Sequence, residues 1–294
     1  MGCPIPKRSA EAWRIQKDRA PHNPGLVFDR FISDWGFDKD RDAKRKAWQE
    51  ILGPVNKPDQ ELFKEWRNLW EATVRAAGAA PFSLKTQWRL VAGLGRKGLL
   101  EVGFTFNQYG FPVVPGSSLK GLARMWVLVV LAEALGISQL KELDSILTVQ
   151  EEKEYQEAFL NRYPAAGQNV LGLAGKFRSV FGTIAGAGGA VFFDAIPARM
   201  PKLELDVMNP HYSEYYQDKS RKIPPANWLS PVPVYFLTVA PGTEFIFAVG
   251  WRGSHDEETS LLWGLAREWL VQGLQNLGVG AKTSAGYGYF VRPG

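Results

Sequence analysis

The pattern of apolar residues changes at Ser83, and this change constrains the fold more than any other feature of the sequence. Before it, apolar residues recur at helical spacing, which predicts helices over 42–52 and 58–70. After it, short strand-like segments alternate with longer helical ones and with glycine-rich turns. The strands expected there are 83–91, 99–106, 190–194, 234–239, 244–251 and 287–291, and the helices are 117–135 and 257–277. This alternation is typical of an α+β fold with an antiparallel sheet.

The same change predicts two parts in the chain. Residues 1–80 are expected to form an N-terminal arm and helical extension, with an extended start because four prolines (Pro4, Pro6, Pro21 and Pro24) lie among charged residues. A helix stop is expected at Gly53-Pro54. Residues 81–294 are expected to form the main domain, in which a charged, helical insertion occupies about 137–168.

The helix expected over 58–70 carries an apolar stripe. Leu62, Phe63, Trp66, Leu69 and Trp70 fall on one of its faces. This periodicity favours burial in a core, or contact with another subunit, over stacking of the tryptophans on RNA bases.

Composition narrows the classes of function. Lys and Arg number 35 against 30 Asp and Glu, so the net charge of +5 mildly favours a polyanionic partner. One cysteine, Cys3, excludes an intramolecular disulfide, and three scattered histidines argue against a metal site, so no cofactor is expected. No apolar region of a secretory signal follows the N-terminus, and the most apolar run, 125–135, is too short to span a membrane. We therefore expect a cytoplasmic protein.

The first candidate site is the start of the helix expected over 117–135. Ser117 or Ser118 is expected to cap this helix. A helix N-terminus presents unpaired backbone N–H groups and the positive end of the helix dipole, so it attracts anions. Lys120 and Arg124 lie four residues apart, on one face near that end. These features suit a phosphate, although an ordinary capped helix with solvated charges explains them equally well on physical grounds.

The second candidate site is the glycine-rich segment before the last strand. Between Gly278 and Gly294 lie Lys282 and Arg292 and no acidic residue. Successive backbone N–H groups in such turns form nests for phosphate oxygens, and glycine lets another chain approach the backbone closely. Tyr287 or a neighbouring tyrosine is expected to stack on a base. The alternative, a tight connection between helix and strand, accounts poorly for so many glycines.

Two stretches resemble nucleotide-binding motifs but lack the context that these motifs need. Residues 93–98 match the dinucleotide-binding fingerprint, yet a strand rather than a helix is expected to follow. Residues 278–283 resemble a Walker A loop, but Ala281 occupies a glycine position and the order of helix and strand is reversed. Neither is expected to bind a nucleotide, although Arg96 and Lys97 can still face a phosphate backbone.

Candidates for catalysis are weak. No Ser/His/Asp set is readable, and no histidine pair has metal-ligand spacing. For His211 a structural or contact role is favoured over that of a general base, because nothing visible would orient it. Asp194 and Asp206 could act as acids, but a lone carboxylate is weak evidence. No catalytic residue and no metal are therefore expected.

The two candidate sites together resemble a known family. Residues 114–124 are similar to the signature helix start of RAMP-superfamily CRISPR proteins, and residues 278–288 to their C-terminal glycine-rich loop. Between them, 190–195, 206–212 and 231–239 resemble the family of the sixth subunit of the type III-B (Cmr) effector complex. The resemblance extends over about 83–292 and leaves the role of the tryptophan-containing N-terminal helices open.

The resemblance implies a ferredoxin-like, RRM-like core and a non-catalytic, RNA-binding role in antiviral defence. The partners that it implies are the guide RNA toward its 3′ end, its duplex with target RNA, the other Cmr RAMP subunits and the small helical subunit. Target cleavage would then belong to a neighbouring subunit. The residues that it marks for RNA contact are Ser117, Ser118, Lys120, Arg124, Gly278, Gly280, Lys282, Ser284 and Gly286.

A guide-holding subunit must accept any guide sequence, so its contacts are expected on phosphates and sugars rather than on base edges. Two other classes of function stay open. One is a RAMP endoribonuclease that uses His211 or Asp206, and the other is a purely structural capping subunit. The capping role would leave the basic helix start and the glycine-rich loop unexplained.

Overall fold

The computed structural model describes residues 5–19, 21–31, 41–96, 102–210, 215, 218–220, 224, 231, 233–253 and 256–293. The chain divides into two compact units. The first unit comprises residues 1–63, 91–112 and 200–240, and the second comprises 64–90, 113–199 and 241–294. Segments 91–112 and 200–240 thus belong with the N-terminal helices, although they follow the boundary expected at residue 80.

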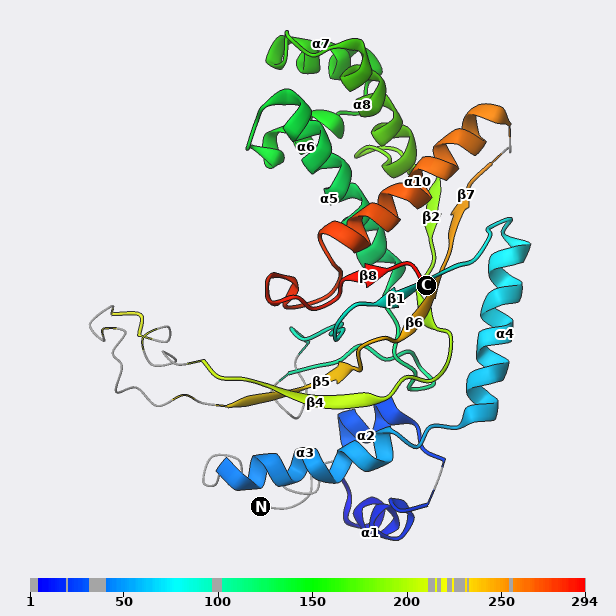
Figure 1. Ribbon diagram of the computed structural model, residues 1–294, viewed down its shortest axis with the longest axis vertical. Helices are drawn as coiled ribbons and strands as arrows, with labels where there is room; N and C mark the ends of the chain where they lie inside the picture. Colours follow the sequence, from blue (N-terminus) through cyan, green and yellow to red (C-terminus); the bar gives the residue numbers. More distant parts are fainter. Residues whose placement is uncertain are drawn as a thin grey trace. The chain divides into compact units, whose positions relative to one another are not determined.

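The second unit is built on a four-stranded antiparallel sheet in the order β3-β6-β1-β8 (Figure 1). Its strands are β1 (Phe82–Thr86), β3 (Ile196–Pro197), β6 (Glu244–Phe247) and β8 (Phe290–Val291). A separate antiparallel pair joins β2 (Ala190–Phe192) to β7 (Val249–Trp251). The antiparallel α+β class expected from the sequence is confirmed.

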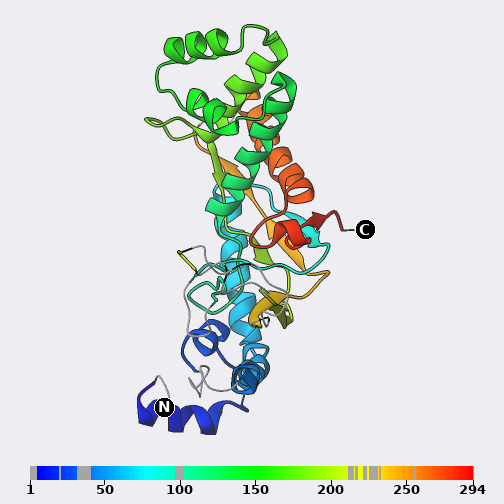
Figure 2. The same ribbon diagram turned by 90° about the vertical axis from the view of Figure 1, so that its left-hand side faces the viewer.

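Helices α5 (Gly116–Leu135) and α10 (Glu257–Asn276) lie against each other in both views (Figures 1 and 2). Alternation in β1 buries Leu84 and Thr86 and exposes Lys85, because successive strand residues point to opposite faces. Beside them, the rings of Phe245 and Phe247 meet Phe290 edge-on at 5.9 and 5.3 Å. The core of this unit is therefore assembled from strands that are distant in sequence.

A helical insertion follows α5 and consists of α6 (Leu140–Leu147), α7 (Glu152–Arg162) and α8 (Gln168–Phe181). Its helical character was expected over 137–168, whereas α8 was not predicted. In the described part of the chain no single helix is long and apolar enough to cross a membrane, and α5 with α6 passes that test only as a pair bent by 109°.

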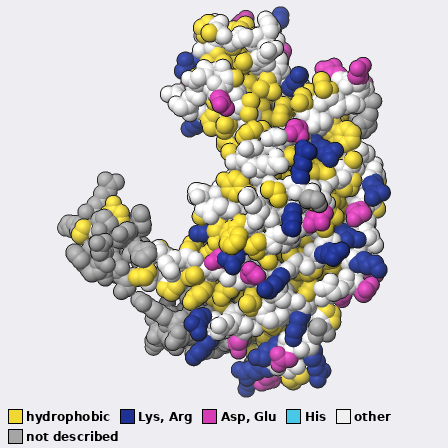
Figure 3. Space-filling view, viewed as in Figure 1, with side chains coloured by type: hydrophobic (Ala, Val, Ile, Leu, Met, Phe, Trp, Pro, Cys, Tyr) yellow, Lys and Arg dark blue, Asp and Glu magenta, His cyan; other side chains and the backbone are white. Residues whose placement is uncertain are grey.

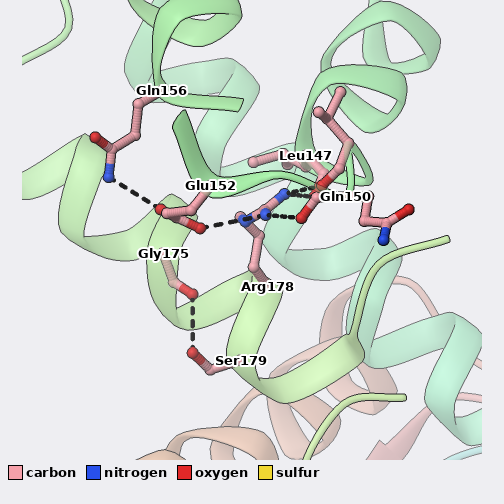
Figure 4. A network of polar contacts seen from close by, with 8 residues as sticks. Leu147, Gln150, Glu152, Gln156, Gly175, Arg178 and Ser179 are labelled. Carbon is pink, nitrogen blue, oxygen red and sulfur yellow. Dashed lines mark hydrogen bonds and ion pairs between the residues drawn. The ribbon is translucent and has the colours of Figure 1, made fainter. Parts of the chain in front are cut away.

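Arg178 of α8 holds the insertion together (Figure 4). Its guanidinium donates to the carbonyl oxygens of Leu147 and Val149 at 2.9 and 2.7 Å and lies 3.2 Å from a carboxylate oxygen of Glu152. It also stacks over the ring of Tyr155, 4.1 Å from the ring centre. Burial raises the pKa of Tyr155 to about 12.

The first unit combines helices α1 (Lys7–Gln16), α2 (Pro24–Arg30) and α3 (Arg41–Val55) with the antiparallel pair β4 (Leu203–Met208) and β5 (Val234–Val239). Asn56 joins the end of α3 to β4: its side chain accepts from the amide of Leu203 at 2.7 Å and donates to the carbonyl of the same residue at 2.9 Å. One side chain thus satisfies both backbone groups of a strand residue.

Three expectations for this unit are wrong. The described residues of the expected extended start contain α1 and the beginning of α2, which Asn23 caps through the amide of Leu26 at 2.9 Å. Helix α3 does not stop at Gly53 but continues through Pro54. In the described part of the strand expected over 99–106, only Phe106 pairs, in an isolated bridge with Pro112.

The apolar stripe expected over 58–70 lies on α4 (Gln60–Ala76) and has mixed exposure. Phe63 is buried, whereas Leu62 and Leu69 are exposed. Trp70 packs against a small core that contains Val74, together with Ala79, Ala248 and Phe193. The expected burial is therefore correct for part of the stripe only.

Candidate nucleic-acid interface

The start of α5 is capped differently from the expectation. The helix begins at Gly116 with Pro115 as its N-cap, and no side chain caps it. Ser117 and Ser118 are exposed and do not act as caps, which corrects the prediction. Instead, Asp194, which follows β2, accepts a hydrogen bond from the amide of Gly116 at 2.7 Å. A carboxylate of the chain itself therefore occupies part of this helix end, as the positive end of a helix dipole favours.

Close backbone contact sets where α5 begins. A Cβ atom at Gly116 would lie 2.1 Å from the carbonyl oxygen of Phe192 in β2, so no side chain fits at this position. This contact and the hydrogen bond from Asp194 hold the helix start against β2. The basic residues of the first turns are consequently carried by a rigid element, as a precise binding site requires.

Lys120 forms a cationic pair with a residue that the sequence did not mark, Arg252. Burial, then the positive charges of Arg252 and Arg124, lower the pKa of Lys120. Arg252 follows β7, is exposed, and donates its amide to the carbonyl of Gly189 at 2.8 Å. In the described residues, neither Lys120 nor Arg252 has a carboxylate within ion-pair distance. Binding of an anion between two such cations is favourable because it offsets their mutual repulsion.

Arg124 is engaged elsewhere, although it shares a helix face with Lys120. Its guanidinium forms an ion pair with Asp144 of α6 at 2.6 Å and lies 5.2 Å from the ring centre of Phe177 in α8. Its charge is thus already neutralised by the insertion. The expectation that both cations are available to one phosphate does not fit this arrangement, because Arg124 is already paired with Asp144.

The glycine-rich segment forms a loop whose backbone turns repeatedly through positive φ. Gly278, Gly280, Gly286 and Gly288 have φ between 71° and 91°. A Cβ atom at Gly288 would lie 1.9 Å from the carbonyl oxygen of Val279, so this glycine is required for the loop to close on itself.

The tip of the loop keeps backbone donors available. A short 3₁₀ turn (Thr283–Ala285) forms the tip, where Ser284 and Gly286 are exposed. In the described structure the amides of Gly280, Thr283 and Ser284 donate to no backbone carbonyl. Adjacent unpaired amides at an exposed turn have the arrangement that binds phosphate oxygens. The predicted nest is therefore compatible with the loop, and its use by RNA stays a prediction.

Lys282 and Tyr287 form a pair inside this loop. Lys282 is the only non-glycine residue with positive φ, 62°, in the described chain, and its Nζ lies 5.9 Å from the ring centre of Tyr287. Tyr287 is 9% exposed. A ring buried to this extent supports the lysine but cannot stack on a base, so the expected stacking role of Tyr287 is not supported by its position.

Helix α10 brings the loop to the end of α5 where that helix begins (Figures 1 and 2). Gly273 lies in the last turn of α10, and a Cβ atom there would be 3.0 Å from Cγ of Leu122. Leu122 lies between Lys120 and Arg124 on α5, and the loop starts five residues after Gly273. The two segments that the sequence marked separately therefore lie at one end of the same helix pair.

The third predicted basic position lies in the first unit. The amide of Arg96 closes a turn onto the carbonyl of Gly93 at 3.0 Å, and its guanidinium lies 3.5 Å from the carbonyl of Phe104. Residues 93–96 thus form a tight turn. Lys97 lies outside the described residues.

The described residues contain no group of three or more His, Cys, Asp and Glu side chains that could hold a metal ion. Asp194 caps α5, and a carboxylate oxygen of Asp206 accepts from the amide of Val207 at 2.8 Å. His211 lies outside the described residues. Elsewhere, Lys and Arg side chains are interspersed with Asp and Glu on the face shown in Figure 3.

Comparison with known proteins connects this geometry to a family. Residues 82–291 match the model of the RAMP superfamily. The chain is 35% identical over 254 residues to the CRISPR system Cmr subunit Cmr6 of Pyrococcus furiosus, and the alignment covers 79% of this chain and 73% of that protein.

Two solved structures are also similar. The crystal structure of Cmr6 from Pyrococcus furiosus matches with 33% identity and a TM-score of 0.48, over 74% of this chain and 98% of that one. A chain of the cryo-EM structure of the type III-B Cmr-beta bound to cognate target RNA matches with 18% identity and a TM-score of 0.54, over 98% of this chain and 86% of that one. The family match and the curated relative establish that the chain belongs to the RAMP superfamily and, within it, to the Cmr6 family of CRISPR Cmr subunits.

Proposed function

We propose that this chain is a non-catalytic RNA-binding subunit of a type III-B CRISPR ribonucleoprotein. In this role it holds the guide RNA toward its 3′ end, or the duplex of guide and target, by the phosphate backbone. The observation that carries the proposal is the cationic pair Lys120 and Arg252, which has no acidic partner in the described chain and lies on the α5 end that the glycine-rich loop also reaches.

The proposed contacts are suited to phosphates. Lys120 and Arg252 supply positive charge, and the loop tip supplies backbone amides and Lys282. None of these groups distinguishes one base from another, because sequence is read at base edges and not at the backbone. Pairing between guide and target would then carry all sequence specificity.

A ferredoxin-like core is part of the proposal. It is supported by the chain order β1, α5, β2 and β3, β6 and β7, α10, β8, and by the sheet order β3-β6-β1-β8. Two helices that follow alternate strands, with the last strand beside the first, are the pattern of this fold. The proposed partners are the other Cmr RAMP subunits and the small helical subunit, in the cytoplasm.

Crosslinking to RNA tests the proposal directly. Purified chain, alone and in the assembled complex, is irradiated with labelled guide RNA, and the crosslinked peptides are identified. We expect crosslinks at residues 115–124 and 278–288, a strong decrease in the Lys120→Ala/Lys282→Ala variant, and no cleavage. A double variant of two exposed lysines in the insertion, Lys153→Ala/Lys176→Ala, is the matched control.

Three results would contradict the proposal. Cleavage of RNA by the isolated chain, lost in His211→Ala, would identify a nuclease. A loss of affinity that depends on RNA sequence would indicate base readout in place of backbone clamping. Normal assembly without any crosslink would indicate a structural capping subunit.

A further inference from the structure

A hollow on the second unit lies beside α10 and is separate from the loop and the start of α5. Its volume is about 520 Å³, and one stripe of α10 lines it together with the first residues of β1 and the C-terminal end of the chain. The residues that line it are Phe82, Ser83, Leu84, Gly264, Arg267, Glu268, Val271, Arg292 and Pro293. A volume of this size lies within the range of small-ligand sites.

The floor of the hollow is a stacked pair. The guanidinium carbon of Arg267 lies 4.6 Å from the ring centre of Phe82, and this ring in turn stacks on Phe247 at 5.7 Å with an interplanar angle of 22°. Arg267 is exposed, and in the described structure no carboxylate lies within ion-pair distance of it. A planar cation with one face on an aromatic ring and no acidic partner offers its other face to a further flat group.

The space itself is created by a missing side chain. Gly264 lies one turn before Arg267 on α10, and a Cβ atom there would meet nothing within 4 Å. This glycine is therefore not required by packing, and its position leaves the hollow open. At the opposite border, Arg292 follows β8, is exposed and also has no ion pair among the described residues.

We propose that this hollow binds one unpaired nucleotide of RNA, with the base stacked on the guanidinium plane of Arg267 and the phosphate near Arg292. RNA-binding proteins commonly hold splayed-out bases on aromatic rings or arginine planes, and this stacking tolerates any base. Glu268 borders the base end, where its carboxylate accepts from the side-chain amide of Gln272 at 2.6 Å, so the phosphate belongs at the other end. The inference rests on the proposed RNA-binding function and adds a single-strand contact to its backbone contacts.

Filling the hollow tests the inference without disturbing the core. Gly264→Leu occupies it from a helix position that has free space, and Gly172→Leu places the same side chain at an equally open glycine of α8. Binding of a fluorescent uridine octamer to the full chain is measured for both variants, for Arg267→Lys and for Lys120→Ala. We expect Gly264→Leu to weaken binding about 5- to 100-fold, as the loss of one base stack would, and Gly172→Leu to leave it unchanged. Arg267→Lys keeps the charge but should lose most of the same affinity.

The possible failures are distinguishable. If Lys120→Ala weakens binding while Gly264→Leu and Arg267→Lys do not, the inference is wrong and the proposed function stands. If the wild-type chain does not bind the octamer at all, both are overturned. If Gly264→Leu binds RNA normally but no longer assembles with the other Cmr subunits, the hollow is a protein contact and the inference is again wrong.

Discussion

The basic residues at the start of α5 and those of the helical insertion are of the same types but are placed in opposite ways. In the insertion, Arg178 is 8% exposed, and carbonyl oxygens and the carboxylate of Glu152 surround its guanidinium. At the start of α5, Lys120 and Arg252 have no acidic partner in the described chain. A cation whose donors are satisfied by its own chain stabilises the fold, whereas a repelled pair is available to an anion. The partners of a basic residue, rather than the number of basic residues, separate structural regions from binding regions.

The largest effect is expected where the insertion loses its central cation. Arg178→Leu leaves the buried carbonyl of Leu147 and the partly buried carbonyl of Val149 without this donor, so the free energy of unfolding should fall by about 3 kcal/mol. Denaturant unfolding measures this change, with exposed Lys176→Leu as the control. RNA affinity of the folded variant should be unchanged. A loss of affinity without a loss of stability would remove the distinction between the two regions.

Removal of either unpaired cation should have the next largest effect. Lys120→Ala and Arg252→Ala should each weaken RNA binding about tenfold, equally for all RNA sequences, and should lower the salt slope by about 1. Stability should not fall, since no ion pair in the described chain is lost. Titrations at several salt concentrations, with Lys153→Ala as the reference, make the measurement. An unchanged slope in both variants would place the phosphate elsewhere.

Arg124 sharpens the comparison because it lies one helical turn from Lys120 but faces the insertion. Arg124→Ala breaks a partly exposed ion pair with Asp144 and a stack on Phe177, so stability should decrease by about 1 kcal/mol. The salt slope of RNA binding should remain that of the wild type. Thermal unfolding and salt titration on one preparation measure both quantities. Unchanged stability together with a lower salt slope would show that Arg124 contacts the RNA.

Lys282 allows charge and conformation to be separated. Its backbone has φ of 62°, which a side chain disfavours, so Lys282→Gly removes the charge and also relieves strain. We expect a small gain in stability, below about 1 kcal/mol, together with severalfold weaker RNA binding. Lys282→Arg is the control that keeps the charge. Weaker binding in the arginine variant as well would mean that RNA binding depends on the shape of the loop and not on the charge of residue 282.

The smallest effect concerns pH. The pKa of Lys120 is lowered in the folded protein from the ordinary 10.5, so the unfolded chain binds more protons at this residue between the lowered value and 10.5. Its contribution to stability is therefore unfavourable below the lowered pKa and recovers as pH rises toward 10.5. The stability difference between Lys120→Met and the wild type should be largest near neutral pH and should shrink across this window. A pH-independent difference would show that packing of the side chain, not its charge, is involved.

The sequence predicted much of the second unit because many of its helices and strands have a clear pattern of apolar residues within their own segment. Helices α5 and α10 carry long apolar patterns, and β5 and β6 fall within the expected strands. The first unit was predicted less well, since prolines suggested an arm where Asn23 caps α2 and Pro54 is tolerated within α3. Strand β4 and helix α8 have no strong local signal. Strand β4 depends on pairing with β5, and α8 on the contact of its Arg178 with the end of α6 at Leu147.

In the candidate site, too, local patterns were predictable from the sequence and contacts between distant residues were not. The glycine pattern of 278–288 and the approximate start of α5 were readable, although its cap was not, because glycine requirements and helix starts are properties of neighbouring residues. The only signal for Arg252 was a basic residue at the end of a strand, which is too common to select it.

What the sequence by itself determined is the α+β class, the position of α5 and the glycine-rich loop, since these follow from periodicity and backbone preference over a few residues. The tertiary structure alone decided that Asp194 caps α5, that Asp144 neutralises Arg124 and that Arg252 joins Lys120. Each of these pairs joins residues on separate elements. Charge partnership depends on distance in space, which local sequence patterns do not contain.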